Sequence, residues 1–255
     1  GSTETGKFLM REAANRIKRV SLDLGGNAPF IVFPDADMER AVGDLVSLKT
    51  LNSGQICVTA NRVLVERSIH DRFVERLLER LGEERVGDGR EPETTMGPLI
   101  SRQAVEDAAA LVDGAIAEGA QLLRGGEKPP SGPGECFYPL TVLDGVTQSM
   151  RIANEEVFGP VFPIIVFDSE EEALKIANDT EYGLSAFVYT NDMARAQRFA
   201  DGLEAGVIGI NDPRPHTPDV PFGGLKMSGI GKEGGTEGLL EYMEAKVIGT
   251  RFSKL

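Results

Sequence analysis

Short apolar runs alternate with amphipathic helical segments along most of this 255-residue chain. The runs at 30–33, 161–167 and 185–190 are rich in aromatic and β-branched residues, which is typical of strands. Segments such as 71–81 repeat apolar side chains every three or four positions, and this spacing lines one face of a helix. Strands that alternate with helices predict an α/β fold in which helices cover both faces of a sheet.

Local signals place the ends of these elements. The triplet 35–37 offers a carboxylate N-cap, and Ser169 with Glu172 fits a capping box, in which both side chains accept from backbone N–H groups. The segment 125–134 is rich in glycine and proline, which predicts an exposed loop. The predicted helices span 8–18, 38–51, 71–81, 102–118, 170–178 and 192–201. The predicted strands span 19–24, 30–33, 62–66, 138–143, 161–167, 185–190 and 206–210.

Composition argues against several classes of protein. The net charge of −13 disfavours a nucleic-acid partner, because phosphate binding needs clusters of lysine and arginine. No apolar run approaches the roughly 20 residues of a membrane span, and the polar segment 1–19 does not resemble a signal peptide. Cys57 and Cys136 do not suggest a disulfide framework, which favours a reducing compartment and a cytoplasmic location. His70 and His216 lack metal-ligand spacing, so no metal site is expected.

Cys57 is the first candidate for a chemical role. It closely follows Gly54, and Asp23 lies upstream, just before the Gly-Gly pair at 25–26. A thiol must lose its proton before it attacks a carbonyl carbon, and a nearby carboxylate can accept that proton or one from a water. A lone cysteine is more often a buried structural residue, and position alone leaves that interpretation open.

Four segments together resemble motifs of the aldehyde dehydrogenase superfamily. They are Leu-Asp-Leu-Gly-Gly-Asn-Ala-Pro at 22–29, Gly-Gln-Ile-Cys at 54–57, Asn-Glu-Glu-Val-Phe-Gly-Pro-Val at 154–161 and Pro-Phe-Gly-Gly-Leu-Lys-Met-Ser-Gly at 221–229. They occur in the family's order, and the combination is far more specific than any one motif. The resemblance covers essentially the whole chain but only the C-terminal half of the family's length.

The resemblance implies an α/β catalytic domain of the aldehyde dehydrogenase type, a sheet flanked by helices. In this division, 1–24 is the C-terminal edge of the dinucleotide-binding domain, 25–225 is the nucleophile-bearing domain, and 226–255 is a return segment and oligomerisation tail. Such a tail supports dimers and tetramers in the family, so we expect a homodimer or homotetramer. Because most of the cofactor sheet would lie upstream, we expect little activity from the chain alone, and a non-catalytic fragment stays an alternative.

The resemblance also implies a reaction. Cys57 would attack an aldehyde, hydride would pass to NAD or NADP, and water would hydrolyse the resulting thioester to a carboxylic acid. The backbone N–H of Cys57 and an asparagine from the upstream half would stabilise the oxyanion. The chemistry therefore requires a small aldehyde substrate and a nicotinamide cofactor, with no membrane or nucleic-acid partner.

Several residues would hold the cofactor by the same resemblance. Glu156 would accept hydrogen bonds from the hydroxyls of the nicotinamide ribose, and Phe158 would pack nearby. Ser2 opens a helix, whose free N–H groups suit a pyrophosphate. The alternative is that the acidic pair at 155–156 merely faces water. The residues expected beside the cofactor are Ser2, Leu24, Gly25, Glu156 and Phe158.

Asp23 departs from the family pattern, because most members have glutamate at that place. Aspartate is one methylene shorter, roughly 1.5 Å of reach. A misplacement of about 1 Å can slow a reaction about 10²-fold, so we expect slower thioester hydrolysis if Asp23 is the base. Two alternatives stay open: Asp23 only orders the turn at 25–26, or the enzyme passes its acyl group to coenzyme A, which needs no strong hydrolytic base.

The substrate is the least determined part of the hypothesis. The sequence as a whole resembles succinate-semialdehyde dehydrogenases. Those enzymes commonly carry an arginine six positions before the nucleophile to bind the substrate carboxylate. Leu51 occupies that position here, so a bidentate guanidinium is missing there. The substrate is then a neutral aldehyde, or its carboxylate is bound elsewhere. Arg214 and His216, in the proline-rich loop 211–218, are candidate substrate contacts, although a plain surface loop is equally compatible.

Overall fold

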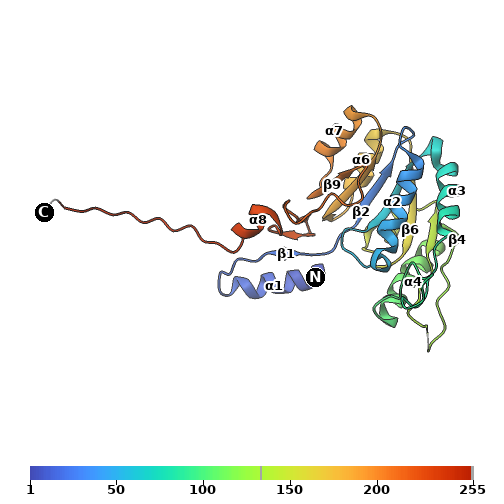
Figure 1. Ribbon diagram of the computed structural model, residues 1–255, viewed down its shortest axis with the longest axis horizontal. Helices are drawn as coiled ribbons and strands as arrows, with labels where there is room; N and C mark the ends of the chain where they lie inside the picture. The colour runs from blue at the N-terminus through green and yellow to red at the C-terminus, as the bar shows by residue number, and fades with distance from the viewer. Residues whose placement is uncertain (133, 254–255) are drawn as a thin grey trace.

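A seven-stranded sheet forms the centre of the computed structural model, which describes residues 1–132 and 134–253 (Figure 1). Neighbouring strands run parallel except at one edge, where β4 pairs antiparallel with β5. In spatial order the strands are β4 (Gln121–Arg124), β5 (Thr141–Asp144), β6 (Val161–Phe167), β3 (Ala60–Glu66), β2 (Ala28–Val32), β8 (Ser185–Tyr189) and β9 (Val207–Ile210). The expected α/β class is confirmed.

Helices cover both faces of this sheet, because successive strand residues point to opposite sides. Phe30 and Val32 of β2 pack in one apolar core with helices α2 and α3, whereas Ile31 packs in the other core with α4, α6 and α7. The two cores together bury most of the apolar side chains of β2, β3, β6 and β8. The helices are α2 (Met38–Thr50), α3 (His70–Leu81), α4 (Arg102–Ala117), α5 (Arg151–Asn154), α6 (Glu170–Asn178) and α7 (Met193–Gly202).

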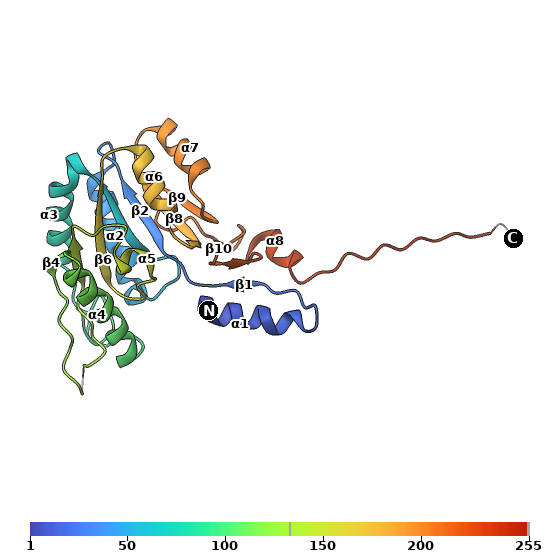
Figure 2. The ribbon, with the colours of Figure 1, turned by 180° about the vertical axis from the view of Figure 1, so that it is seen from behind.

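Smaller elements lie beside the sheet (Figures 1 and 2). Two short antiparallel pairs lie here: β1 pairs with β11 and joins the N-terminal part of the chain to the C-terminal part, and β7 pairs with β10. Beyond α8 the chain extends away from the body, and its Tyr242, Val247 and Phe252 are largely exposed. No helix in the described part of the chain combines the length and apolar character that crossing a bilayer requires. These elements are α1 (Thr3–Ala14), β1 (Leu22–Asp23), η1 (Leu51–Gly54), η2 (Arg67–Ile69), β7 (Tyr182–Gly183), β10 (Leu225–Lys226), β11 (Gly229–Ile230) and α8 (Gly235–Leu240).

The structure confirms most of the predicted elements and corrects the first helix. The bounds 8–18 were wrong, because α1 begins at Thr3, but the expectation that Ser2 opens a helix is confirmed: its side chain caps α1 by accepting from Thr5 N. The helix stops before Ile17, whose φ is 52°. The capping serine at 169 accepts from Glu172 N at 3.2 Å, while the carboxylate of Glu172 accepts from Asp168 N. β1 lies within the predicted strand 19–24, whereas β4, β7, β10, β11 and α5 were missed because elements this short carry no periodic pattern.

His70 joins the start of α3 to the end of β5. Its Nε2 lies 2.8 Å from Asp144 Oδ1, and its Nδ1 lies 2.9 Å from Asp71 Oδ1. Burial alone would lower the pKa of His70, but the hydrogen bonds to Asp144 and Asp71 outweigh it, so the pKa is raised. A histidine with a raised pKa in the folded state adds stability that is full below its unfolded pKa and lost as the pH rises through the folded value.

We therefore expect His70→Gln to lower the free energy of unfolding by about 1 kcal/mol at pH 5.5 and by less at pH 8.5. Urea unfolding followed by circular dichroism at both pH values measures the difference. An equal loss at the two pH values would show that the charge of His70 contributes nothing.

Candidate active site

Cys57 and Asp23 lie together. The thiol Sγ is 4.0 Å from Asp23 Oδ2, in the orientation in which the thiol donates. Both residues line a cavity of about 700 Å³. All of the residues predicted for catalysis or cofactor binding line this same cavity, namely Ser2, Asp23, Leu24, Gly25, Cys57, Glu156 and Phe158. The sequence prediction of one shared site is compatible with this geometry, and the role of each residue stays a prediction.

The cavity lies at the amino-terminal ends of the central strands. Gly26 comes just before β2, Cys57 just before β3, and Glu156 a few residues before β6. Ligand sites of open parallel sheets usually lie at the carboxyl ends of the strands. The fold class alone would therefore direct attention to the opposite edge of this sheet.

Glycines allow the segments around the thiol to approach one another. A Cβ on Gly26 would lie 2.3 Å from the carbonyl oxygen of Cys57, and this distance is too short for any side chain at position 26. Gly54 has a φ of 73°, and a Cβ there would lie 2.4 Å from the carbonyl oxygen of Gly159. The glycines of two predicted motifs are thus required because the backbones of separate segments come into contact.

The backbone just before the thiol is in a strained conformation. Asn52 and Ser53 have φ values of 48° and 58°, a left-handed region that non-glycine residues seldom adopt. Hydrogen bonds stabilise this turn: Asn52 Nδ2 donates to Gln55 O at 2.9 Å, and Ser53 Oγ donates to Gly97 O at 2.9 Å. Such strain often accompanies functional sites, and no sequence pattern had indicated it here.

Burial keeps the resting thiol protonated. It raises the pKa of Cys57 to about 11, and the charges of Asp23 and Glu156 add to the effect. The pKa of Asp23 is also raised, first by burial and then by Glu233, while the N-terminal ammonium lowers it. Asp23 Oδ1 is buried and has no hydrogen-bond partner among the described residues. A carboxylate of raised pKa beside a protonated thiol can accept a proton from it.

Glu156 faces the glycine turn, whereas its neighbour faces solvent. Its Oε1 accepts from Gly26 N at 2.9 Å, and a Cβ on Gly25 would lie 2.7 Å from Oε2. Burial raises the pKa of Glu156, and the Gly26 N–H opposes that rise. Glu155 instead pairs with Arg151 on the surface. The alternative in which the whole acidic pair faces water is therefore wrong for Glu156.

Buried polar side chains form a platform under the glycine turn, which sequence reasoning missed. β2 and β3 shift register between Ala28 and Pro29, and Asn61 is the extra residue of this β-bulge. Asn61 Nδ2 donates to Gly26 O at 3.2 Å, while Lys49 Nζ donates to Asn61 Oδ1 at 3.5 Å. Polar residues at the start of an otherwise apolar strand were the available sequence signal.

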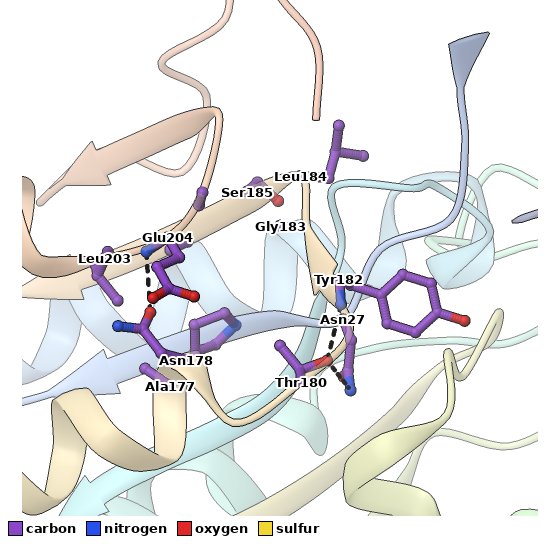
Figure 3. A pocket seen from close by; sticks show the side chains of 13 residues that line it. Asn27, Ala177, Asn178, Thr180, Tyr182, Gly183, Leu184, Ser185, Leu203 and Glu204 are labelled. Carbon is purple, nitrogen blue, oxygen red and sulfur yellow. Dashed lines mark hydrogen bonds between the residues drawn. The ribbon is translucent and has the colours of Figure 1, made fainter. Parts of the chain in front are cut away.

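Arg62 and Asn27 hold the other end of this platform. Arg62 is fully buried and donates to Asn27 O at 3.0 Å and to the carbonyls of Ile176 and Ala177. Figure 3 shows Asn27 beside Thr180, and Asn27 Nδ2 also donates to the Ala153 carbonyl. Asn27 Oδ1 has no partner within the described ranges, and the adjoining cavity of about 10 Å³ has room for roughly one water.

The two predicted substrate contacts lie in different places. Arg214 lines a second cavity of about 420 Å³, and its guanidinium donates to Ser47 Oγ at 2.9 Å. His216 packs against Phe222, with ring centroids 5.8 Å apart, and lines neither this cavity nor the thiol cavity. A substrate role for His216 stays a prediction.

The fold and the site define a class of α/β proteins that present a thiol and two carboxylates in one cavity at the amino ends of parallel strands. The model of the aldehyde dehydrogenase family matches residues 1–248, and the chain belongs to that family. The resemblance seen in the sequence motifs is thereby confirmed.

Individual relatives agree with this assignment. The chain is 48% identical over 246 residues to an aspartate-semialdehyde dehydrogenase (non-phosphorylating) of Halomonas elongata, covering 96% of the chain and 50% of the relative. It is 43% identical to a probable succinate-semialdehyde dehydrogenase [NADP(+)] of Sinorhizobium fredii, covering 97% and 50%. A point mutant of betaine aldehyde dehydrogenase from Staphylococcus aureus, solved with NAD+, superposes with a TM-score of 0.92 at 41% identity, covering 96% and 50%. The chain spans about half the length of these relatives.

Proposed function

We propose that this chain supplies the thiol-bearing half of an NAD(P)-dependent aldehyde dehydrogenase that forms a carboxylic acid. The observation that carries the proposal is the 4.0 Å approach of Cys57 Sγ to Asp23 Oδ2 in a cavity that also contains Glu156. Asp23 accepts the thiol proton as Sγ adds to the aldehyde carbon, which gives a thiohemiacetal. When bound, the nicotinamide ring accepts the hydride that leaves this carbon. Asp23 first passes the thiol proton to solvent. Its carboxylate then accepts a proton from the water that attacks the thioester and returns it to the leaving sulfur, which releases the carboxylic acid and restores the Cys57 thiol.

The residues around the cavity fit a dinucleotide. Oε1 of Glu156 accepts a hydrogen bond from the Gly26 N–H, and this contact orients the carboxylate. Its other oxygen, Oε2, is left to accept from sugar hydroxyls. Phe158 is 45% exposed and offers an aromatic surface at the cavity wall. Ser2 caps α1, and the first N–H groups of that helix suit a pyrophosphate. The relatives named with NADP(+) or solved with NAD+ support the same cofactor class.

An aldehyde that carries a carboxylate is the substrate class we propose. The Halomonas elongata and Sinorhizobium fredii relatives are named for aspartate semialdehyde and succinate semialdehyde, and both of these molecules combine the two groups. The Staphylococcus aureus neighbour is named for betaine aldehyde, which carries a quaternary ammonium instead. The charge of the substrate is therefore the property that an assay must vary.

Association of several copies is the second part of the proposal. The extended residues after α8 expose Tyr242, Val247 and Phe252, and apolar side chains in extended backbone suit addition to a sheet of another subunit. We propose a homodimer or homotetramer, in which 1–24, 25–225 and 226–255 serve as cofactor-domain edge, nucleophile domain and tail.

The test uses two forms of the protein. One is the chain itself, and the other is the chain placed behind the first half of the Halomonas elongata relative, which we call the full-length chimera. NAD(P)H formation is followed by absorbance, and the products are identified with and without coenzyme A. We expect the chimera to release free acid and the isolated chain to be far slower. Product that forms only as an acyl-coenzyme A would favour acyl transfer, and no turnover by the chimera would refute the dehydrogenase.

Asp23 gives a sharper test of the hydrolytic step. We expect Asp23→Asn in the chimera to slow acid release about 10²-fold, because the amide cannot accept a proton, and Asp23→Glu to speed it. Rapid-quench measurement of the acyl-enzyme separates hydrolysis from the earlier steps. Unchanged hydrolysis in Asp23→Asn would leave Asp23 with only the role of ordering the glycine turn, and an unimproved Asp23→Glu would show that reach is not limiting.

A further inference from the structure

The second cavity, lined by Arg214, adjoins the thiol cavity. Asn52 lines both, and it belongs to the tight turn of η1 that leads to Cys57. Its carbonyl accepts from Gln55 N at 3.0 Å, which keeps the turn compact. The thiol cavity and the second cavity therefore share one wall residue, and a ligand that reaches from the thiol past Asn52 would enter the second cavity.

The second cavity has a positive and hydroxyl-rich lining. Ser47, Thr50, Ser53 and Thr95 contribute hydroxyls, and Arg214 contributes a guanidinium. In the part of the chain that the structure describes, no aspartate or glutamate lines it. This is a notable local exception in a chain with a net charge of −13. Hydroxyls around a guanidinium, with no competing carboxylate, suit a small anion.

The guanidinium of Arg214 is positioned but not neutralised. One of its terminal nitrogens donates to Ser47 Oγ at 2.9 Å, and among the described residues the side chain forms no ion pair. The carboxylate of Asp212 is used differently, since its Oδ1 accepts from the backbone N–H of Arg214 at 2.8 Å. Pro213 and Pro215 flank Arg214 and restrict its backbone, which lowers the entropy lost when a ligand binds.

We propose that Arg214 binds the carboxylate end of the substrate while the aldehyde end lies at Cys57. This inference rests on the proposed dehydrogenase function and adds the residue that selects the substrate charge. A guanidinium binds a carboxylate through two parallel hydrogen bonds, which lysine cannot reproduce. The exposed Leu51 forms the apolar part of the same wall and suits the methylene chain between the two ends.

The kinetic test compares three aldehydes of different charge in the full-length chimera: succinate semialdehyde, butanal and betaine aldehyde. We expect Arg214→Gln to lower kcat/KM for succinate semialdehyde by about 10- to 10²-fold, mostly through KM, because a charged hydrogen bond is lost. Butanal should change by less than about two-fold, and betaine aldehyde should improve, since the repulsion is removed. Arg214→Lys should restore part of the loss. Arg198→Gln, a surface arginine that pairs with Glu170, is the control.

A second measurement needs no turnover. In the isolated chain, an aldehyde that adds reversibly to Cys57 protects the thiol from iodoacetamide, and mass spectrometry reports the alkylated fraction. We expect succinate semialdehyde to protect at an at least ten-fold lower concentration than butanal, and this gap to close in Arg214→Gln. A gap that is absent, or that survives the substitution, overturns the role of Arg214. The two proposals can fail separately. If the chimera shows no turnover but succinate semialdehyde still protects the isolated chain at a lower concentration than butanal, and this difference depends on Arg214, the dehydrogenase is refuted and the carboxylate site stands.

Discussion

Replacing Cys57 by alanine in the full-length chimera is expected to lower kcat/KM for aldehyde oxidation by at least about 10³-fold. The thiol is the group that faces Asp23 across 4.0 Å, and alanine offers no atom that can add to a carbonyl carbon. The loss should appear in kcat, because the wall around Asn52 and Arg214 that would bind the substrate is untouched. The measurement is the initial rate of NAD(P)H formation over a range of succinate semialdehyde concentrations.

Cys136 provides the matched control for this experiment. It is the only other cysteine of the chain, and its carbonyl accepts from Leu99 N, in a loop outside both cavities. Cys136→Ala should keep the rate within about two-fold, as is usual for substitutions away from special features. Activity that survives in Cys57→Ala would remove the thiol from the reaction, and an equal loss in Cys136→Ala would point to general damage.

Lys49→Met is expected to stabilise the isolated chain at neutral pH. Lys49 is fully buried, and burial lowers its pKa from 10.5 to about 7, against the attraction of Glu156. At a pH between these two pKa values, Lys49 carries a proton in the unfolded chain but not in the folded chain. The free energy of unfolding therefore falls as the pH drops from about 10.5 to 7, by up to roughly 5 kcal/mol. Methionine has a similar length and carries no proton, so Lys49→Met removes this pH-dependent cost.

The expected gain at pH 7 is about 3 kcal/mol, because Asn61 Oδ1 loses its partner and costs about 1–2 kcal/mol. Urea unfolding at pH 7 and pH 10 measures the difference between variant and parent, and the gain should shrink or reverse at pH 10. Lys175→Met, an exposed lysine on α6, controls for the general effect of losing a charge. A gain of the same size at both pH values would contradict a proton-linked cost at Lys49.

The sequence predicted the parts of the fold in which one physical signal dominates. α2 and α3 came within a residue or two of their predicted ends, because their apolar side chains repeat at helical spacing and face one core. The apolar pattern placed the start of α1 too late, because the cap at Ser2, which the family resemblance did indicate, precedes any apolar repeat. The β1–β11 pair depends on residues more than 200 positions apart, which local patterns cannot reveal.

The candidate site divides in the same way. The sequence allowed three site residues to be proposed, because their motifs hold unusual residues in a recognisable order: Cys57, Asp23 and Glu156. The platform of Lys49, Asn61 and Arg62 was missed, because buried polar and charged side chains in helices and strands resemble ordinary surface residues until their hydrogen bonds are seen. The contact between Arg214 and Ser47 joins a loop after β9 to α2, a juxtaposition that only the tertiary fold creates.

The β-bulge at Asn61 has a consequence for redesign of this protein. Strand residues beyond the bulge, such as Val63 and Val65, fill the core, whereas the turn before it carries the thiol. The bulge residue is also the contact between the two, because Asn61 Nδ2 donates to the carbonyl of Gly26, which packs against the backbone of Cys57. Thermostabilising substitutions in the core beside Asn61 and substitutions that alter substrate choice are therefore to be combined only after a double-mutant cycle has measured their coupling.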